Sequence, residues 1–253
     1  MQEKRKNPSD NERQVLFDEV YGCCPICGNK LTHTKNNRIY KIFEIAHIYP
    51  LNPTPEEVEL LKNEEKLSLD VNDLKNLLAV CKSCHNKFDN PRTIEEYRSW
   101  IKIKRKIIQD NNIKDFYSLF NIEDEIYEVL KKLNSTSLDE EMVPLSLDSL
   151  KIDDKVNETL PYILKRSIKN GVVDYFEYIK KNFIELDKLT PNKFNTVAAQ
   201  IKSFYCKCIQ INNNQEIVYY HIVDWLDKKT GHYSKPACEI IVAYFVQNCE
   251  VFS

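Results

Sequence analysis

The sequence predicts an α+β protein in two parts: a small N-terminal part with short strands and cysteine pairs, and a mainly α-helical C-terminal part. Three observations carry this prediction. Two Cys-x-x-Cys pairs lie within the first 90 residues, short apolar runs of strand character precede the second pair, and apolar residues further along recur at helical spacing. A chain of 253 residues is long enough for both parts to have a core.

The composition excludes several classes of protein. The N-terminus is polar, and no stretch approaches the roughly 20 apolar residues that span a bilayer. We therefore expect a cytoplasmic protein that does not contact a membrane, whose nine cysteines are reduced and either ligate metal or are buried. The net charge of −2 does not by itself indicate a nucleic-acid binder, so any grip on DNA must come from a local patch or from a partner.

The N-terminal part is predicted to contain, in order, a helix, a strand, a helix, a strand and a helix: residues 10–20, 39–48, 55–66, 76–80 and 93–110. Pro50 ends the first strand, which carries His47. Thr54, Pro55 and Glu57 form a capping box with proline at the first helical position, and this starts the second helix.

The helical pattern continues through residues 111–133 and is then broken by polar residues and a proline. We therefore expect a first domain over 1–133, a linker over 134–149 and a second domain over 150–253 with three or four helices. The last apolar run, CEIIVAYFVQNCEVF, predicts a core helix or an interface.

The strongest signal is the two cysteine pairs, Cys24/Cys27 and Cys81/Cys84. Zinc prefers four thiolates in a tetrahedron, and a two-residue gap lets one tight turn present two sulfurs to one ion. A structural zinc site is therefore predicted, with a folded insert between its halves. Cys23 competes with Cys24 as a ligand, and plain burial of reduced cysteines is the alternative interpretation.

The segments EIAHIYP (44–50) and NLLAVCKSCHNK (76–87) resemble the zinc-stapled HNH endonucleases, and the resemblance covers about residues 22–90. It implies a ββα-metal domain that hydrolyses phosphodiester bonds in DNA, which we expect to be double-stranded. It further implies that His47 is the general base, that Asn76 holds the loop that orients this base, and that His85 binds a catalytic Mg²⁺, Mn²⁺ or other divalent ion. These roles suit imidazole chemistry near neutral pH.

One position departs from the family pattern. The residue before the base histidine is usually an acidic or histidine metal ligand, and here it is Ala46. Glu44 lies two residues earlier, on the same side of a strand, and is the candidate substitute ligand. Ala46 also keeps a second hypothesis open, in which the protein is a non-catalytic zinc module that binds nucleic acid or protein.

Several basic residues follow the second cysteine pair and are candidates for contact with DNA phosphates: Lys87, Arg98, Lys102, Lys104, Arg105 and Lys106. A basic helical face is also an ordinary solvated face, and the sequence does not separate the two interpretations.

The C-terminal segment WLDKKTGHYSKPACEIIVAYFVQNCEVF resembles the last module of effectors in bacterial ABC-three-component, Lamassu-like defence systems. This resemblance covers about residues 150–253. It implies that this part binds an SMC-like, ABC-type ATPase and a small adaptor subunit, and that the whole chain is the nuclease effector of an anti-phage complex.

Overall fold

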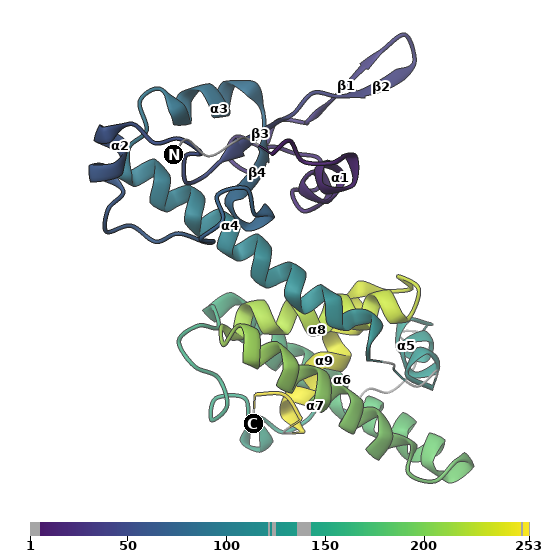
Figure 1. Cartoon of the computed structure of the whole chain (residues 1–253). Coiled ribbons are helices and arrows are strands. Elements are labelled where there is room, and N and C mark those ends of the chain that lie inside the picture. Colours follow the sequence, from purple (N-terminus) through teal and green to yellow (C-terminus); the bar gives the residue numbers. More distant parts are fainter. Residues whose placement is uncertain (1–5, 121, 123–124, 136–142, 249, 253) are drawn as a thin grey trace. The chain divides into compact units, whose positions relative to one another are not determined.

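The computed structural model describes residues 6–120, 122, 125–135, 143–248 and 250–252. The chain divides into two compact units, Met1–Asn111 and Asn112–Ser253. The described strands lie in the first unit, and the described part of the second unit is helical, so the predicted α+β class is confirmed (Figure 1). Among the described residues, no helix combines the length and the apolar character needed to cross a membrane.

The first unit is built from two small antiparallel sheets and several helices. Its elements are α1 (Asp10–Asp18), β1 (Thr32–Lys35), β2 (Arg38–Lys41), β3 (Glu44–His47), α2 (Pro55–Leu60), the 3-10 turn η1 (Leu74–Asn76), β4 (Leu77–Val80), α3 (Lys82–Asp89) and α4 (Ile94–Asp115), which runs across the division.

The centre of the first unit is the pair β3 and β4, followed directly by α3. The two strands are antiparallel, with Glu44 opposite Val80 and His47 opposite Leu77. All four residues of β4 are buried, because this strand is apolar throughout and lies in the core of the unit. This arrangement places the start of α3 beside the strand that carries His47.

The predicted single strand over 39–48 is wrong in one respect, because the chain forms two strands there. The first half is β2, which pairs with β1 in a hairpin, and the second half is β3. The turn between β1 and β2 is Asn36–Asn37, and both residues have positive φ angles of 50° and 57°. Asparagine tolerates this conformation, which two-residue hairpin turns of type I′ require.

Helix α2 begins as predicted and ends earlier than predicted. The capping box of Thr54 and Glu57 is present, with proline in the first turn. The helix stops at Leu60, because the chain beyond it is held against α4. There the Tyr97 hydroxyl donates to the carbonyl of Glu65 at 2.6 Å. A tertiary contact thus replaces the expected last turn.

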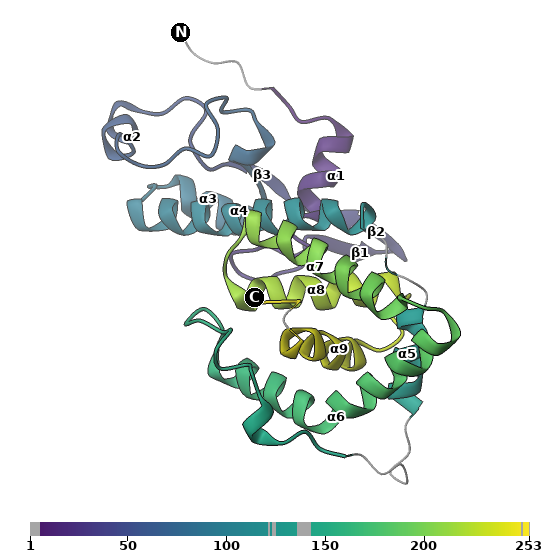
Figure 2. The same ribbon diagram turned by 90° about the horizontal axis from the view of Figure 1, so that it is seen from below.

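The second unit is a helical assembly around one buried helix. Its elements are η2 (Phe116–Ser118), α5 (Glu125–Ser135), η3 (Leu147–Ser149), α6 (Tyr162–Leu189), α7 (Lys193–Ile211), α8 (Gln215–Lys229) and α9 (Lys235–Gln247). Residues 241–247 of α9 are all buried, and Figure 2 shows this helix between α6 and α8. Of the two interpretations of the last apolar run, the structure supports the core helix.

The domain boundary lies earlier than the sequence suggested. The expected linker was 134–149, of which 136–142 lie outside the described residues, whereas the units divide at Asn111/Asn112. Helix α5 belongs to the second unit, because its apolar face at positions 126, 129, 130 and 133 is buried in that core. The described end of the expected linker, residues 143–149, therefore also lies in the second unit.

Candidate functional site

The two cysteine pairs are presented by two different local structures. In the first, the amide of Cys24 donates to the carbonyl of Asn29 and the amide of Gly28 donates to the carbonyl of Cys24, both at 2.8 Å. Gly28 has φ +75°, which explains a glycine in this turn. In the second, Cys81 is the N-cap of α3, and its sulfur accepts from the amide of Cys84 at 3.5 Å.

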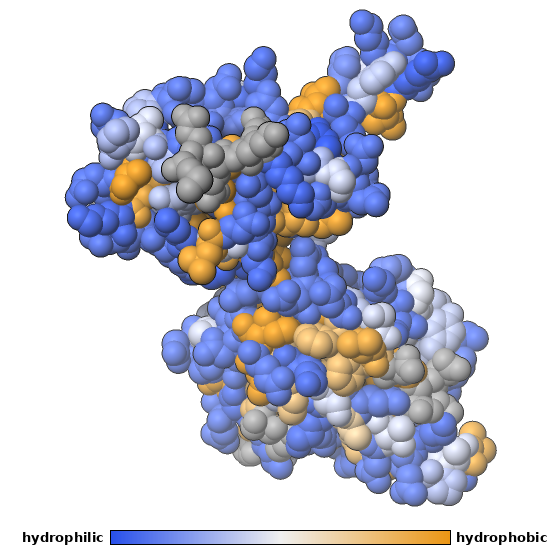
Figure 3. All heavy atoms as spheres, viewed as in Figure 1, coloured by the Kyte–Doolittle hydropathy of each residue, from blue (hydrophilic) through white to orange (hydrophobic). Residues whose placement is uncertain are grey.

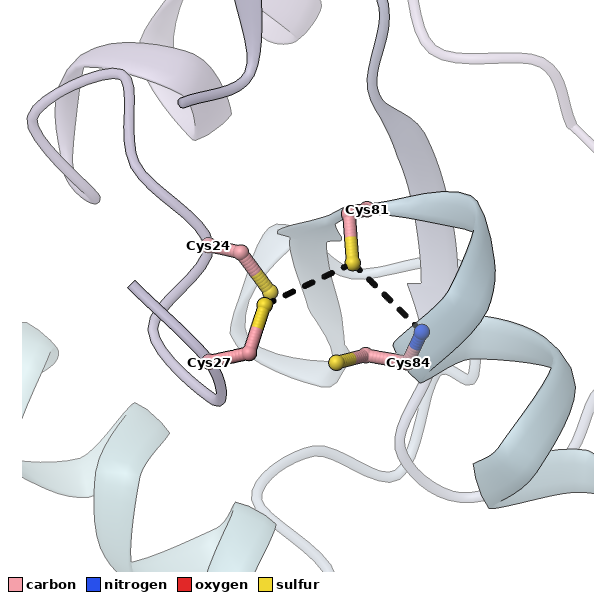
Figure 4. A group of neighbouring side chains, drawn as sticks. All are labelled: Cys24, Cys27, Cys81 and Cys84. Carbon is pink, nitrogen blue, oxygen red and sulfur yellow. Dashed lines mark hydrogen bonds between the residues drawn. The ribbon is translucent and has the colours of Figure 1, made fainter. Parts of the chain in front are cut away.

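These turns bring four sulfurs together (Figure 4). The Sγ atoms of Cys24, Cys27, Cys81 and Cys84 all lie within 4.8 Å of one another, and Cys27 Sγ is 3.7 Å from Cys81 Sγ. A tetrahedral zinc ion with bonds of about 2.3 Å holds its sulfurs about 3.8 Å apart. The cluster therefore fits zinc, and it contains Cys24 in preference to Cys23.

The acidity of the cluster agrees with a cation site. Burial raises the pKa of the Cys24 thiol, but hydrogen bonds from backbone amides in both turns outweigh this effect and lower the pKa to about 7. Burial and the neighbouring sulfurs raise the pKa of the Cys84 thiol. Thiolates this close repel one another unless a cation lies between them, so the donor set is suited to a soft divalent ion.

His47 lies at the end of β3, and a buried asparagine holds the chain that follows it. The side-chain Nδ2 of Asn76 donates to the carbonyls of Tyr49 and Val71 at 2.9 and 2.8 Å, and its Oδ1 accepts from the amide of Tyr49 at 2.8 Å. The amide of Ile48 donates to the carbonyl of Asn76 at 2.9 Å. Asn76 therefore fixes the backbone next to His47.

His85 lies on α3 between two carboxylates. Its Nδ1 donates to Glu44 at 2.7 Å, and its Nε2 is 3.2 Å from the Asp89 carboxylate. The contact with Asp89 raises the pKa of His85, burial opposes this, and Glu44 adds to the increase. Burial tends to raise the pKa of Asp89, but the nearby His85, Arg92 and His47 outweigh this effect, so the pKa is lowered overall.

Arg92 anchors this group from the side. Its side chain is 3% exposed, and its guanidinium forms ion pairs with Glu57 and Asp89. The same guanidinium lies over the ring of Phe88, 4.6 Å from its centroid. A buried cation with two carboxylate partners holds Asp89 in place and contributes positive charge to the site.

These residues surround one pocket of about 290 Å³ in the first unit. Its lining is His47, Pro50, Leu51, Asn52, Glu57, His85, Asp89 and Arg92. Imidazole and carboxylate groups thus converge on a space that solvent reaches. Such a set can move a proton and can bind a divalent cation.

Some of the predicted site residues lie together in the structure and others do not. The structure brings together Glu44, His47 and His85 near Asn76, as the sequence suggested. Asp89 was missed as a site residue, although it had a signal in the sequence, because it lies four residues after His85 and hence on the same face of a helix.

The basic residues do not form one face. Lys87, Lys102 and Lys106 are exposed. Arg98 and Arg105 are paired with acidic residues of the segment after α2. Phosphate contact by Lys104 is contradicted, since its side chain is 1% exposed and forms an ion pair with Glu19 inside the unit.

Comparison with known proteins gives two family matches. Residues 24–94 match the HNH endonuclease family. Residues 113–252 match CTD11, the C-terminal domain 11 of the ABC-three component (ABC-3C) systems. No curated protein matches the chain. The second match covers more than half of the chain and the first covers the cysteine cluster and the pocket, so the chain belongs to the CTD11 family of ABC-3C systems and carries an HNH endonuclease domain before it.

Proposed function

We propose that this chain is a metal-dependent endonuclease that hydrolyses phosphodiester bonds of double-stranded DNA, as the nuclease effector of a Lamassu-like defence complex in the cytoplasm. The observation that carries the proposal is the arrangement of His85 between Glu44 and Asp89 at the pocket that His47 also lines. Hydrolysis of a phosphodiester needs a base for the attacking water and a cation near the leaving oxygen, and this pocket has groups for both.

His47 is the proposed general base. It lies at the pocket surface on the last position of β3, and Asn76 fixes the backbone that follows it. A base must stand at a constant distance from the attacking water, so the two-way hydrogen bonding of Asn76 to Tyr49 is a positioning role. Deprotonation of water by the neutral imidazole leaves His47 protonated, close to the negative charge of Asp89.

We assign the catalytic cation to His85 Nε2 and the Asp89 carboxylate. These donors are adjacent and face the pocket, and Mg²⁺ and Mn²⁺ accept such a set when water and substrate phosphate complete the shell. The bound ion supplies Lewis-acid stabilisation of the phosphate and of the leaving oxygen. Glu44 contacts the opposite nitrogen of His85, so its proposed role is to orient the ring, in place of the ligand role that the sequence suggested.

This assignment is tested by Mn²⁺ titrations of DNA cleavage by single variants of this chain, assembled with the ATPase partner. Asp89→Asn removes a ligand charge, and Glu44→Gln removes the charge that orients His85. We expect both variants to need at least about tenfold more Mn²⁺ for half-maximal rate, with the larger effect for Asp89→Asn. Glu59→Gln is the matched control, since Glu59 forms only an exposed pair with Lys62. Unchanged Mn²⁺ dependence of both variants would rule the assignment out.

The second unit has a proposed role in assembly. The CTD11 match implies a multicomponent system, and we infer that Asn112–Ser253 binds the SMC-like ATPase or its small adaptor. A nuclease of net charge −2 has weak attraction to DNA by itself, and tethering to a DNA-bound partner raises its local concentration to about the millimolar range. The nuclease is then restrained until the assembly engages foreign DNA.

A non-catalytic zinc module remains the competing function. Ala46 is the residue that favours it, because it is fully buried and offers no ligand. Asp89 weakens this alternative, since it supplies a carboxylate next to His85 on α3, whereas Ala46 lies on β3. Metal-dependent cleavage that disappears with His47→Ala separates the two functions.

A further inference from the structure

The β1–β2 hairpin (Thr32–Lys35 and Arg38–Lys41) projects from the body of the first unit and has no part in its core (Figure 1). Every residue from His33 to Ile42 is exposed, on both faces of the ribbon. In Figure 3 the tip of this hairpin carries hydrophilic residues. A two-stranded ribbon that is exposed on both faces is marginal in water, so we expect its function to lie in a contact outside the unit.

The hairpin is nevertheless firmly attached at its base. Leu31 is fully buried and Phe43 nearly so, one on each side of the base. The amide of Ile42 donates to the carbonyl of Leu31 at 2.9 Å, and the amide of Leu31 donates to the carbonyl of Gly22 at 2.8 Å. The base of the ribbon is therefore hydrogen-bonded to the segment that leads into the first cysteine pair.

The charge of the hairpin is of one sign. Residues 29–43 contain four Lys or Arg residues and no Asp or Glu. One of the four, Lys41, is engaged inside the unit, since it donates to Gln14 and lies over the ring of Phe17. The other three, Lys30, Lys35 and Arg38, are exposed, and the hairpin carries no acidic residue that would compensate their charge.

The strand register gathers this charge on one face. Lys35 is paired with Arg38, and His33 is paired with Tyr40. Partners in a strand pair point to the same side, and alternate pairs share a face, so these four side chains form one surface. Two like charges directly opposite each other destabilise a hairpin, and a bound polyanion offsets this repulsion because it attracts both charges.

We propose that the face formed by His33, Lys35, Arg38 and Tyr40 is the surface through which this protein grips double-stranded DNA, with the ribbon lying in the major groove. The major groove admits a two-stranded β-ribbon, and Lys35 and Arg38 match phosphate by charge. The helix α4 is the weaker candidate, because its Lys104 is buried and two of its arginines are paired within the unit. The inference rests on the proposed nuclease function and names the surface that holds the substrate.

The test uses the full-length chain with no added catalytic ion, and measures duplex DNA binding by fluorescence anisotropy over a range of salt concentrations. The double variant Lys35→Gln with Arg38→Gln is compared with Lys62→Gln with Lys75→Gln, which removes two exposed charges elsewhere in the same unit. We expect the hairpin variant to lower the slope of log affinity against log salt by about 1.8, and the control to leave it unchanged. Removal of the like-charge pair should not lower the unfolding temperature, so lost binding cannot reflect unfolding.

The inference is overturned if the hairpin variant keeps the parent's slope, or if the parent does not bind duplex DNA at low salt. It is also overturned if the variant loses single-stranded DNA alone, or loses co-purification with the ATPase partner while duplex binding is unchanged. Cleavage by the assembled complex is measured separately. If the parent cuts DNA and the hairpin variant cuts equally well, the hairpin assignment fails and the nuclease function stands, whereas an inert parent contradicts the nuclease function itself.

Discussion

The buried ion pair of Lys104 and Glu19 gives a direct prediction about the first unit. The side chains are 1% and 7% exposed, and Lys104 donates to the Glu19 carboxylate. Because both groups are buried away from water, the pKa of Lys104 is lowered and the pKa of Glu19 is raised. Lys104→Met keeps the volume and leaves the carboxylate uncompensated, which costs about 3–5 kcal/mol. At about 4 °C per kcal/mol, the unfolding midpoint of this unit should fall by roughly 12–20 °C.

The assay is differential scanning calorimetry of the full chain, with Lys106→Met as the matched control on the same helix. Lys106 is exposed, so its replacement should change stability by less than about 0.5 kcal/mol. A second replacement, Glu19→Leu, should restore most of the stability lost in Lys104→Met, because it removes the stranded charge. An unchanged midpoint together with weaker DNA binding would show that Lys104 faces phosphate, and would refute the buried pair.

Two other consequences concern the cysteine cluster and the second unit. Cys84→Ser should abolish stoichiometric zinc in metal analysis and unfold the first unit while the helical signal of Asn112–Ser253 persists, since site formation and folding are coupled; full zinc content in the variant would contradict this. Truncation after Asn111 should abolish co-purification with the ATPase partner. Retained co-purification would move the docking contact to the first unit.

The sequence predicted those parts of the site that depend on short-range spacing. Each two-residue gap between cysteines determines a local turn, and His47, Asn76 and His85 follow the order of a known motif on β3, η1 and α3. The cluster of four sulfurs, and Glu44 beside His85, are where this reasoning placed them. The start of α2 was equally predictable, because a capping box is a local signal.

The features that were missed depend on tertiary contacts. Periodicity does not reveal that Lys104 has a buried acid 85 residues away, and the basic run on α4 therefore looked like one solvated face. Sequence periodicity assigns α5 to the first domain, because the partners of its apolar face lie far along the chain in α6 and α9. The β1–β2 hairpin had a local signal in its turn, Asn36–Asn37. The separation of β2 from β3 had none, because the apolar residues on both sides of it favour one continuous strand.

The claim that this chain is a metal-dependent nuclease is tested most directly by cleavage of supercoiled plasmid with Mg²⁺ or Mn²⁺ in the presence of the ATPase partner. The parent chain should nick and linearise the plasmid, and omission of the divalent ion should stop the reaction. His47→Ala should reduce the rate by about 10²-fold or more, with zinc content and unfolding midpoint unchanged, because a general base contributes to the rate and not to the core. Equal cleavage by the parent and His47→Ala, or no cleavage by the assembled parent complex, would contradict the account.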